Sequence, residues 1–235
     1  MRKSGRMVVI GCLVGLVTCI GLVGCKDVGK GESKPGEAAA FVPPTIDGDL
    51  GDACYKDAEV TGDWTDVDTG EKAKTKSKVC VCSDDQNLYI AIHNPEPKMK
   101  TVAADITDRD GHVWEDDSNE IFLDPTGKRQ SYYQIIVNTR ETVFDASVTE
   151  AGASKDVAWD AKATVKVVTA PDSWTLELAV PLASLGVKGS PKGQTWAANF
   201  CRNQCQQGDE AVGSGWAPIE GSFHTPADFK DLTLK

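Results

Sequence analysis

The segment HVWEDDSNEIFLDP, residues 112–125, places one tryptophan beside a run of carboxylates and then enters an apolar stretch. The acids are Glu115, Asp116, Asp117, Glu120 and Asp124. An aromatic ring next to carboxylates suits a polar ligand that also has an apolar face, because the ring stacks and the carboxylates accept hydrogen bonds. The competing interpretation makes Trp114 an ordinary core anchor at a strand start, with solvated acids beside it. At this level both interpretations stay open.

The residue patterns of several enzyme classes do not occur in the sequence. His93, His112 and His224 are widely spaced and form no HExxH pair, which argues against a zinc enzyme. There is no GxSxG motif and no glycine-rich loop between a strand and a helix. Carboxylate pairs for glycoside hydrolysis are numerous, but most acids lie in turn-like segments, where they cap and solubilise. We therefore expect a non-catalytic protein that requires no cofactor.

The acidic stretch DITDRDGHVWEDD, residues 105–117, also suggests calcium. It misses the EF-hand spacing, because Ile106 occupies the first ligand position when Gly111 is placed sixth. A structural calcium site of another geometry remains an expectation.

The first twenty-five residues read as a targeting segment. A basic start precedes a long uncharged apolar run, which ends in LVGC at residues 22–25. LVGC resembles the bacterial lipobox, so we expect Cys25 to be lipidated, with an uncleaved transmembrane helix as the alternative. Residues 26–44 contain three glycines, three prolines and few large side chains. We therefore expect residues 26–42 to be a flexible linker and residues 43–235 to form one domain. The predicted location is the bacterial cell envelope, with the chain attached to the membrane through its lipid anchor.

Charge excludes nucleic acid as an expected partner. The formal net charge is −10, and removal of residues 1–25, which carry Arg2, Lys3, Arg6 and no acid, changes it to −13. Nothing in the sequence offers a basic face for phosphates.

The cysteines of the expected domain predict disulfides in an oxidising compartment. They are Cys54, Cys80, Cys82, Cys201 and Cys205. Cys80 and Cys82 share one face of a strand-like run and are too far apart for a direct bond, so their partners must lie elsewhere. The segment CRNQC, residues 201–205, supplies two candidates, and a four-thiolate zinc site is the alternative.

Alternating apolar and polar residues dominate after residue 45. SKVCVCSDDQNLYIAIH reads as a hairpin that turns at residues 84–87, and further short strands follow at NEIFLDP, SYYQIIVNT, ETVFDASV, AKATVKVV, SWTLELAVP and TWAANFCRN. In SWTLELAVP, Trp174, Leu176, Leu178 and Val180 share one face. About nine strands without a βαβ rhythm predict an all-β fold, an antiparallel, jelly-roll-like β-sandwich.

The order of motifs resembles the family 9 carbohydrate-binding modules, which are DOMON-like β-sandwiches. The motifs are PTIDGDLGDACYKDA, VCVCSDDQNLYIAI, WEDDSNEIFLDP, YYQIIVN, WTLELAVPLASLG, WAANFCRNQ and SGWAPIEGSFHTPADFKDLTL, which together span residues 43–235. The resemblance implies an oligo- or polysaccharide partner, held between two aromatic side chains.

The resemblance also implies which residues contact the sugar. Trp114 is one aromatic plate, Phe223 lies at or next to the second, Glu120 is the carboxylate partner and Asn138 an amide partner. Three residues of the same ending pattern complete the rim: Arg202, Trp216 and His224. The other tryptophans, Trp64, Trp159, Trp174 and Trp196, are expected to pack.

Two departures from the family pattern support a different function class. Phe223 stands where the best-studied modules have tryptophan, and Ile136 stands where they have arginine. One alternative is therefore a structural or assembly lipoprotein with a decayed sugar site. Another is a DOMON-type haem-binding electron-transfer module, with Met99 and His93 as candidate ligands.

Overall fold

The computed structural model describes residues 40–60, 62–206, 208 and 210–235. Residues Ala40–Lys235 form one compact unit. The expected lipobox, Cys25 and nearly all of the expected linker lie outside the described residues. In the part of the chain that the structure does describe, no helix has the length and apolar character needed to span a membrane.

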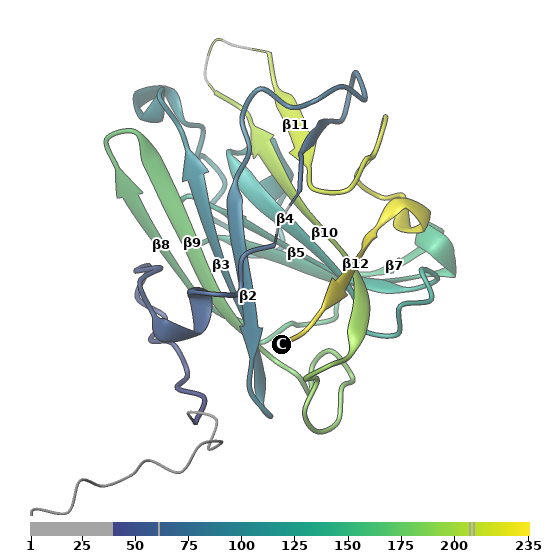
Figure 1. Ribbon diagram of the computed structural model, residues 1–235. Helices are drawn as coiled ribbons and strands as arrows, with labels where there is room; N and C mark the ends of the chain where they lie inside the picture. The colour runs from purple at the N-terminus through teal and green to yellow at the C-terminus, as the bar shows by residue number, and fades with distance from the viewer. Residues whose placement is uncertain (1–39, 61, 207, 209) are drawn as a thin grey trace, which may run out of the picture. The chain divides into compact units, whose positions relative to one another are not determined.

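Two antiparallel sheets form the domain (Figure 1). The smaller has the order β2-β3-β9-β8, with β2 Lys78–Ser83, β3 Asn87–Pro95, β8 Thr164–Ala170 and β9 Ser173–Pro181. The larger has eight strands in the order β1-β11-β10-β4-β5-β6-β7, with β12 also paired to β10. Its strands are β1 Thr65–Asp66, β4 Ser118–Asp124, β5 Tyr132–Asn138, β6 Val143–Thr149, β7 Ser154–Asp156, β10 Thr195–Gln204, β11 Val212–Gly215 and β12 Lys230–Thr233. The predicted all-β, antiparallel sandwich is confirmed.

Short 3-10 turns provide the only helical structure among the described residues. They are η1 Ala53–Tyr55, η2 Met99–Thr101, η3 Val113–Glu115, η4 Glu150–Gly152 and η5 Pro226–Asp228. The strand count is twelve among the described residues rather than about nine. The strands without a counterpart among the eight segments named from the sequence are β1, β7, β11 and β12, which have two to four residues each and are too short to show alternation.

The main core lies between the sheets and follows the two-residue period of the strands. On β9, Trp174, Leu176, Leu178 and Val180 are fully buried in it, as the sequence predicts. On the larger sheet, Ile121 and its neighbours at every second position point into the same core. The alternate positions of the larger sheet therefore face outward, away from the smaller sheet.

Two further apolar clusters cover the outward face of the larger sheet. Phe122 and Tyr132 pack with Phe229 from the C-terminal segment. Ile136 and Phe144 pack with Val113 from η3. These two clusters fix the loops that carry Phe223 and Trp114, and the space between the loops is the candidate site.

The cysteines contradict the expected pairing. All five thiols of the domain are free in the structure. Cys80 and Cys82 lie on the outward face of the smaller sheet, whereas Cys201 lies on the outward face of the larger one. The CRNQC segment does not supply the partner of Cys80 or Cys82, because the whole inter-sheet core separates these faces. A bridge from this strand to Cys54, which packs in the same cluster, stays a prediction. The four-thiolate zinc alternative fails for the same reason.

One thiol pair does come together. Cys54 packs in the same cluster as Cys82, and burial raises the pKa of both thiols. We predict that slow oxidation of the purified protein with diamide at alkaline pH joins Cys54 to Cys82, because thiolate attack needs a neighbouring sulfur. Peptide mass mapping reads the pairing, and Cys54→Ser is the matched control that should leave Cys82 reduced. A bridge from Cys82 to Cys201 or Cys205 would contradict the geometry.

Candidate functional site

Four residues singled out in the sequence line one pocket on the outward face of the larger sheet. Trp114, Glu120, Phe223 and His224 surround a hollow of about 280 Å³ together with Gln134, Lys155 and Asn203. A second hollow of about 320 Å³ also has Trp114, Asn203 and Phe223 in its wall. We call the first hollow the Trp114 pocket. The shared wall residues make the two hollows parts of one depression.

The floor of the Trp114 pocket is a polar row across three neighbouring strands. Gln134 comes from β5, Glu120 from β4 and Asn203 from β10, and the strand register sets them on one face. Gln134 Nε2 and Asn203 Nδ2 each donate to the Glu120 carboxylate at 2.8 Å. Burial raises the pKa of Glu120, and these two hydrogen bonds oppose the rise. The row holds an acceptor-rich carboxylate in a fixed orientation.

One atom of this row has no partner. Gln134 is 1% exposed, and its Oε1 makes no hydrogen bond with any described group. Buried amide oxygens are normally paired. Oε1 is itself buried, so it is an unsatisfied acceptor within the floor and is not part of the exposed pocket surface.

Trp114 forms one wall of the pocket. Its neighbour Val113 is fully buried, whereas Trp114 itself is 36% exposed. Val113 therefore anchors η3 to the sheet, and Trp114 faces the solvent side of the turn. The indole stacks on His112, with ring centroids 4.7 Å apart, and meets Phe144 edge-on at 5.3 Å. The degree of exposure favours a rim position for the indole over the core-anchor interpretation.

Asp116, which follows Trp114, fixes the loop that contains Asp105 and Ile106 on the side away from the pocket. Asp116 accepts hydrogen bonds from the backbone N–H groups of Asp105 and Ile106 at 2.9 and 3.0 Å. Asn138 Nδ2 donates to both Asp116 and the Ile106 carbonyl, at 2.8 and 2.9 Å. These bonds close the loop that precedes Trp114 onto β5. Asp116 and Asn138 therefore position the indole without lining the pocket.

Asp117 connects the segment of Ala103 to Cys205, which follows the end of β10. Its Oδ2 accepts from the backbone N–H of Ala103 at 2.9 Å and of Cys205 at 3.3 Å, while its Oδ1 has no partner among the described groups. Burial raises the pKa of Asp117 to about 6, against the lowering effect of the Ala103 N–H and the Arg202 charge.

Phe223 and His224 form the opposite wall. Phe223 lies so close to Gly213 that a Cβ there would be 3.0 Å from the ring, so glycine is needed for this packing. His224 meets Phe122 edge-on with centroids 5.4 Å apart, and its Nδ1 lies 2.9 Å from the Tyr132 hydroxyl. Desolvation, with a smaller effect of Lys155, lowers the pKa of His224 to about 4, so the imidazole is neutral at pH 7.

Three residues expected at the sugar site lie elsewhere. Arg202 is 1% exposed on the inward face and pairs with buried Glu96 at 2.9 Å, because its place on β10 alternates with that of Asn203. Trp216 is 5% exposed in the inter-sheet core. Asn138 supports the loop, as described above. The lining of the Trp114 pocket thus includes neither Arg202 and Trp216, expected at the rim, nor Asn138, expected as an amide partner.

The alternative cofactor sites find no support in the placement of their candidate ligands. His93 lines a hollow on the outward face of the smaller sheet, whereas Met99 packs against the core between the sheets. Among residues 40–60, 62–206, 208 and 210–235, no group of three or more histidine, cysteine, aspartate or glutamate side chains is arranged to hold a metal ion.

Three lining residues were missed by sequence reasoning. Gln134 was visible in the Q-x-x-x-N strand motif and Asn203 in the CRNQ segment, but only the strand register sets both against Glu120. Lys155 comes from the three-residue β7, which gives no sequence signal.

Comparisons with known proteins agree with this arrangement. The model of the family described as "Carbohydrate family 9 binding domain-like" matches residues 46–235. A family 9 carbohydrate-binding module from Caldicellulosiruptor kristjanssonii in complex with glucose is 19% identical, with a TM-score of 0.58, and the match covers 83% of this chain and 93% of that one. The module from the same organism in complex with cellotriose is 20% identical, with a TM-score of 0.58 and coverages of 83% and 91%.

A candidate carbohydrate-binding protein from Bacteroides uniformis is 20% identical, with a TM-score of 0.60, and the match covers 73% of this chain and 86% of that one. A search of curated proteins gave no significant match. At these identities the solved structures show a shared fold.

The raised pKa of Asp117 predicts a pH dependence of stability. The folded state keeps the proton up to about pH 6, whereas an unperturbed aspartate has a pKa of 3.8. The stability linked to this proton is present below pH 4 and is lost as the pH rises through 6. Relative to Asp117→Asn, which mimics the protonated form, the native chain should lose about 2–3 kcal/mol of unfolding free energy between pH 4 and pH 7.

Urea unfolding at several pH values measures this difference. Asp108→Asn, at an exposed position of the same loop, controls for the change of residue type. A difference between the native chain and Asp117→Asn that does not vary with pH would show that folding does not raise the pKa of Asp117.

Proposed function

This chain belongs to the carbohydrate family 9 binding domain-like family, and we propose that it is a non-catalytic, lipid-anchored protein that binds glycans at the bacterial cell envelope. Its partners are oligo- or polysaccharides, bound in the Trp114 pocket. The observation that carries the proposal is the convergence of Trp114, Glu120, Phe223 and His224 from three separate segments onto one pocket.

The pocket offers the two kinds of contact that a pyranose needs. The indole of Trp114 and the ring of Phe223 provide aromatic surface for the apolar C–H faces of a sugar. Glu120 accepts hydrogen bonds from hydroxyls, and each of its oxygens has capacity beyond the one bond it makes within the protein. Hydroxyl groups are the ligand donors that match these acceptors.

The charge pattern of the pocket supports binding without catalysis. Glycoside hydrolysis by the usual route needs two carboxyl groups on either side of the scissile bond. Glu120 is the one carboxylate among the described residues that line the Trp114 pocket. Asp116 and Asp117, its neighbours in sequence, are engaged with backbone N–H groups elsewhere.

We predict that Trp114→Ala weakens sugar binding more than it destabilises the fold. Because the indole is 36% exposed, its loss should cost about 1–3 kcal/mol of binding free energy, with a small change in melting temperature. A core anchor would instead lose about 3–5 kcal/mol of stability from the cavity. Calorimetric titration with glucose and cellotriose, run beside thermal melts, measures both quantities.

Glu120→Gln and Glu115→Gln form a matched pair for the same titrations. Glu120→Gln keeps the shape of the side chain but removes the charge that strengthens hydrogen bonds to sugar hydroxyls. Glu115 lies in the same segment, is exposed and does not line the pocket, so Glu115→Gln should bind as the native protein does. Native protein that is folded but binds no saccharide would instead favour the structural lipoprotein.

The membrane attachment is tested at Cys25. We predict that Cys25→Ser prevents lipidation, because acyl transfer requires the thiol, and that the variant accumulates as an unprocessed or released precursor. Membrane fractionation and intact mass of the expressed chain measure the change. Cys19→Ser, in the same apolar run, is the control and should leave the lipidated form unchanged. A Cys25→Ser protein that fractionates and migrates as the parent does would overturn the lipobox interpretation.

A further inference from the structure

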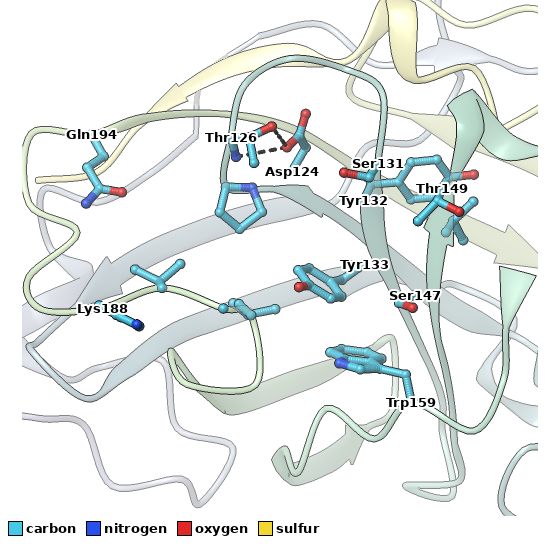
Figure 2. A pocket seen from close by; sticks show the side chains of 15 residues that line it. Asp124, Thr126, Ser131, Tyr132, Tyr133, Ser147, Thr149, Trp159, Lys188 and Gln194 are labelled. Carbon is cyan, nitrogen blue, oxygen red and sulfur yellow. Dashed lines mark hydrogen bonds between the residues drawn. The ribbon is translucent and has the colours of Figure 1, made fainter. Parts of the chain in front are cut away.

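One hollow in the described part of the chain is separate from the Trp114 pocket. It has a volume of about 430 Å³ and lies beside β5, β6 and the segments that contain Trp159 and residues 185–188 (Figure 2). This volume falls within the ~300–1,000 Å³ range of small-molecule sites. We call it the Tyr133 cleft, after the residue that stands at its centre in Figure 2.

The cleft forms where the inward face of the larger sheet changes from apolar to polar. Ile135 on β5 and Val143 on β6 belong to the inter-sheet core. Tyr133, two residues before Ile135, and its β5–β6 register partner Ser147 continue the same face. Both are half-buried rather than buried. Core packing requires apolar side chains at these inward positions. It does not explain why the inward face ends in polar side chains beside an open hollow.

Two aromatic rings stand together in this cleft. Tyr133 and Trp159 stack with centroids 4.6 Å apart and an interplanar angle of 27°. The indole Nε1 donates to the Ser184 carbonyl at 3.2 Å, which fixes the orientation of the ring. Figure 2 shows Tyr133 and Trp159 one above the other, with Ser147 beside them. A rigid aromatic surface of this kind suits the C–H face of a pyranose.

Several polar groups of the cleft have no partner within the described part of the chain. Neither the Tyr133 phenol nor the hydroxyls of Ser147 and Thr149 appear in any hydrogen bond or ion pair there. By contrast, the carboxylate of Asp124 is fully engaged, because it accepts from Thr126 and from the Arg129 N–H. The cleft therefore offers free hydroxyls and no free carboxylate.

We propose that the Tyr133 cleft is a second saccharide-binding site, in which a neutral sugar residue stacks on the Tyr133–Trp159 pair and hydrogen-bonds to Ser147 and Thr149. That the ligand is a saccharide rests on the proposed function. The position of the site rests on the aromatic pair and the unpaired hydroxyls of the cleft. Figure 2 places Lys188 and Gln194 on the side of the cleft opposite Ser147, where they bound the space for the sugar.

One residue connects the two sites. Tyr132 lines the Tyr133 cleft, and its hydroxyl contacts His224 Nδ1 in the wall of the Trp114 pocket at 2.9 Å. Because neighbouring strand residues point to opposite faces, Tyr132 and Tyr133 serve opposite sides of the same sheet. The sites are thus close in sequence but open to different faces, so one short oligosaccharide does not fill both.

The experiment follows the tryptophan indole signals of the full chain. The protein is labelled with ¹⁵N-tryptophan, held in a detergent without a sugar headgroup, and titrated with cellotriose and xylotriose. Trp159→Phe and Trp114→Phe assign the two reporter signals. We expect the Trp159 signal to shift saturably, and to do so also in a Trp114→Ala, Glu120→Gln background.

Ser147→Leu fills the cleft, and Tyr133→Leu removes its aromatic ring. Each should weaken the binding reported by Trp159 about tenfold or more, with the Trp114 signal still responsive. Thr164→Leu, an exposed strand position outside both sites, should leave both responses unchanged. Thermal melts of each variant show whether it is folded. If a variant is not folded, the Trp159 signal of the native chain still tests the second site.

The outcomes separate this inference from the proposed function. If the Trp114 signal shifts and the Trp159 signal does not, the second site is overturned and the first stands. If only the Trp159 signal shifts, the second site is supported and the Trp114 pocket is not the sugar site. If neither signal shifts with either saccharide, both assignments are overturned.

Discussion

The packing of Ile121, Leu123 and Ile135 between the two sheets is the constraint on which the candidate site depends. These residues fix which face of β4 and β5 points inward, and the two-residue period then sends Glu120 and Gln134 outward. A register slip of one residue would bury the polar row in the core and expose the apolar one, at a cost of many buried side chains. The packing of the hydrophobic core therefore also fixes the orientation of the polar floor.

Burial divides the carboxylates around Trp114 into different functions. Asp116 satisfies three donors and closes a loop, and Asp117 joins two segments with one oxygen left unpaired. Glu120 accepts two amide donors from neighbouring strands. A buried carboxylate is costly unless such donors surround it. These paired acids hold the indole and the pocket floor in place, so the site has little to reorganise when a ligand binds.

Sequence patterns predicted the sheets well and the site only in part. The alternation in β2, β3 and β9 is long enough to define both strand and face, whereas strands of two to four residues carry no period and were missed. The aromatic walls followed from motif order. Motif order placed Arg202 at the pocket, but the residue lies on the other face of the sheet. Adjacent residues of β10 point to opposite faces, and only the observed register shows that Asn203 faces the pocket. Partners across sheets, including those of the cysteines, were beyond what spacing along the chain can determine.

The chemistry of the Trp114 pocket limits what its ligand can be. Its floor presents the Glu120 carboxylate as an acceptor, so the proposed ligand must supply hydroxyl donors there. Phenylalanine at position 223 offers a smaller π-surface than the tryptophan of the best-studied modules, which shifts the balance of recognition from stacking towards the polar row. Hydrogen bonds to a preorganised polar row discriminate between sugars by the positions of their hydroxyls more sharply than stacking does, because a mismatched ligand leaves a buried acceptor unpaired.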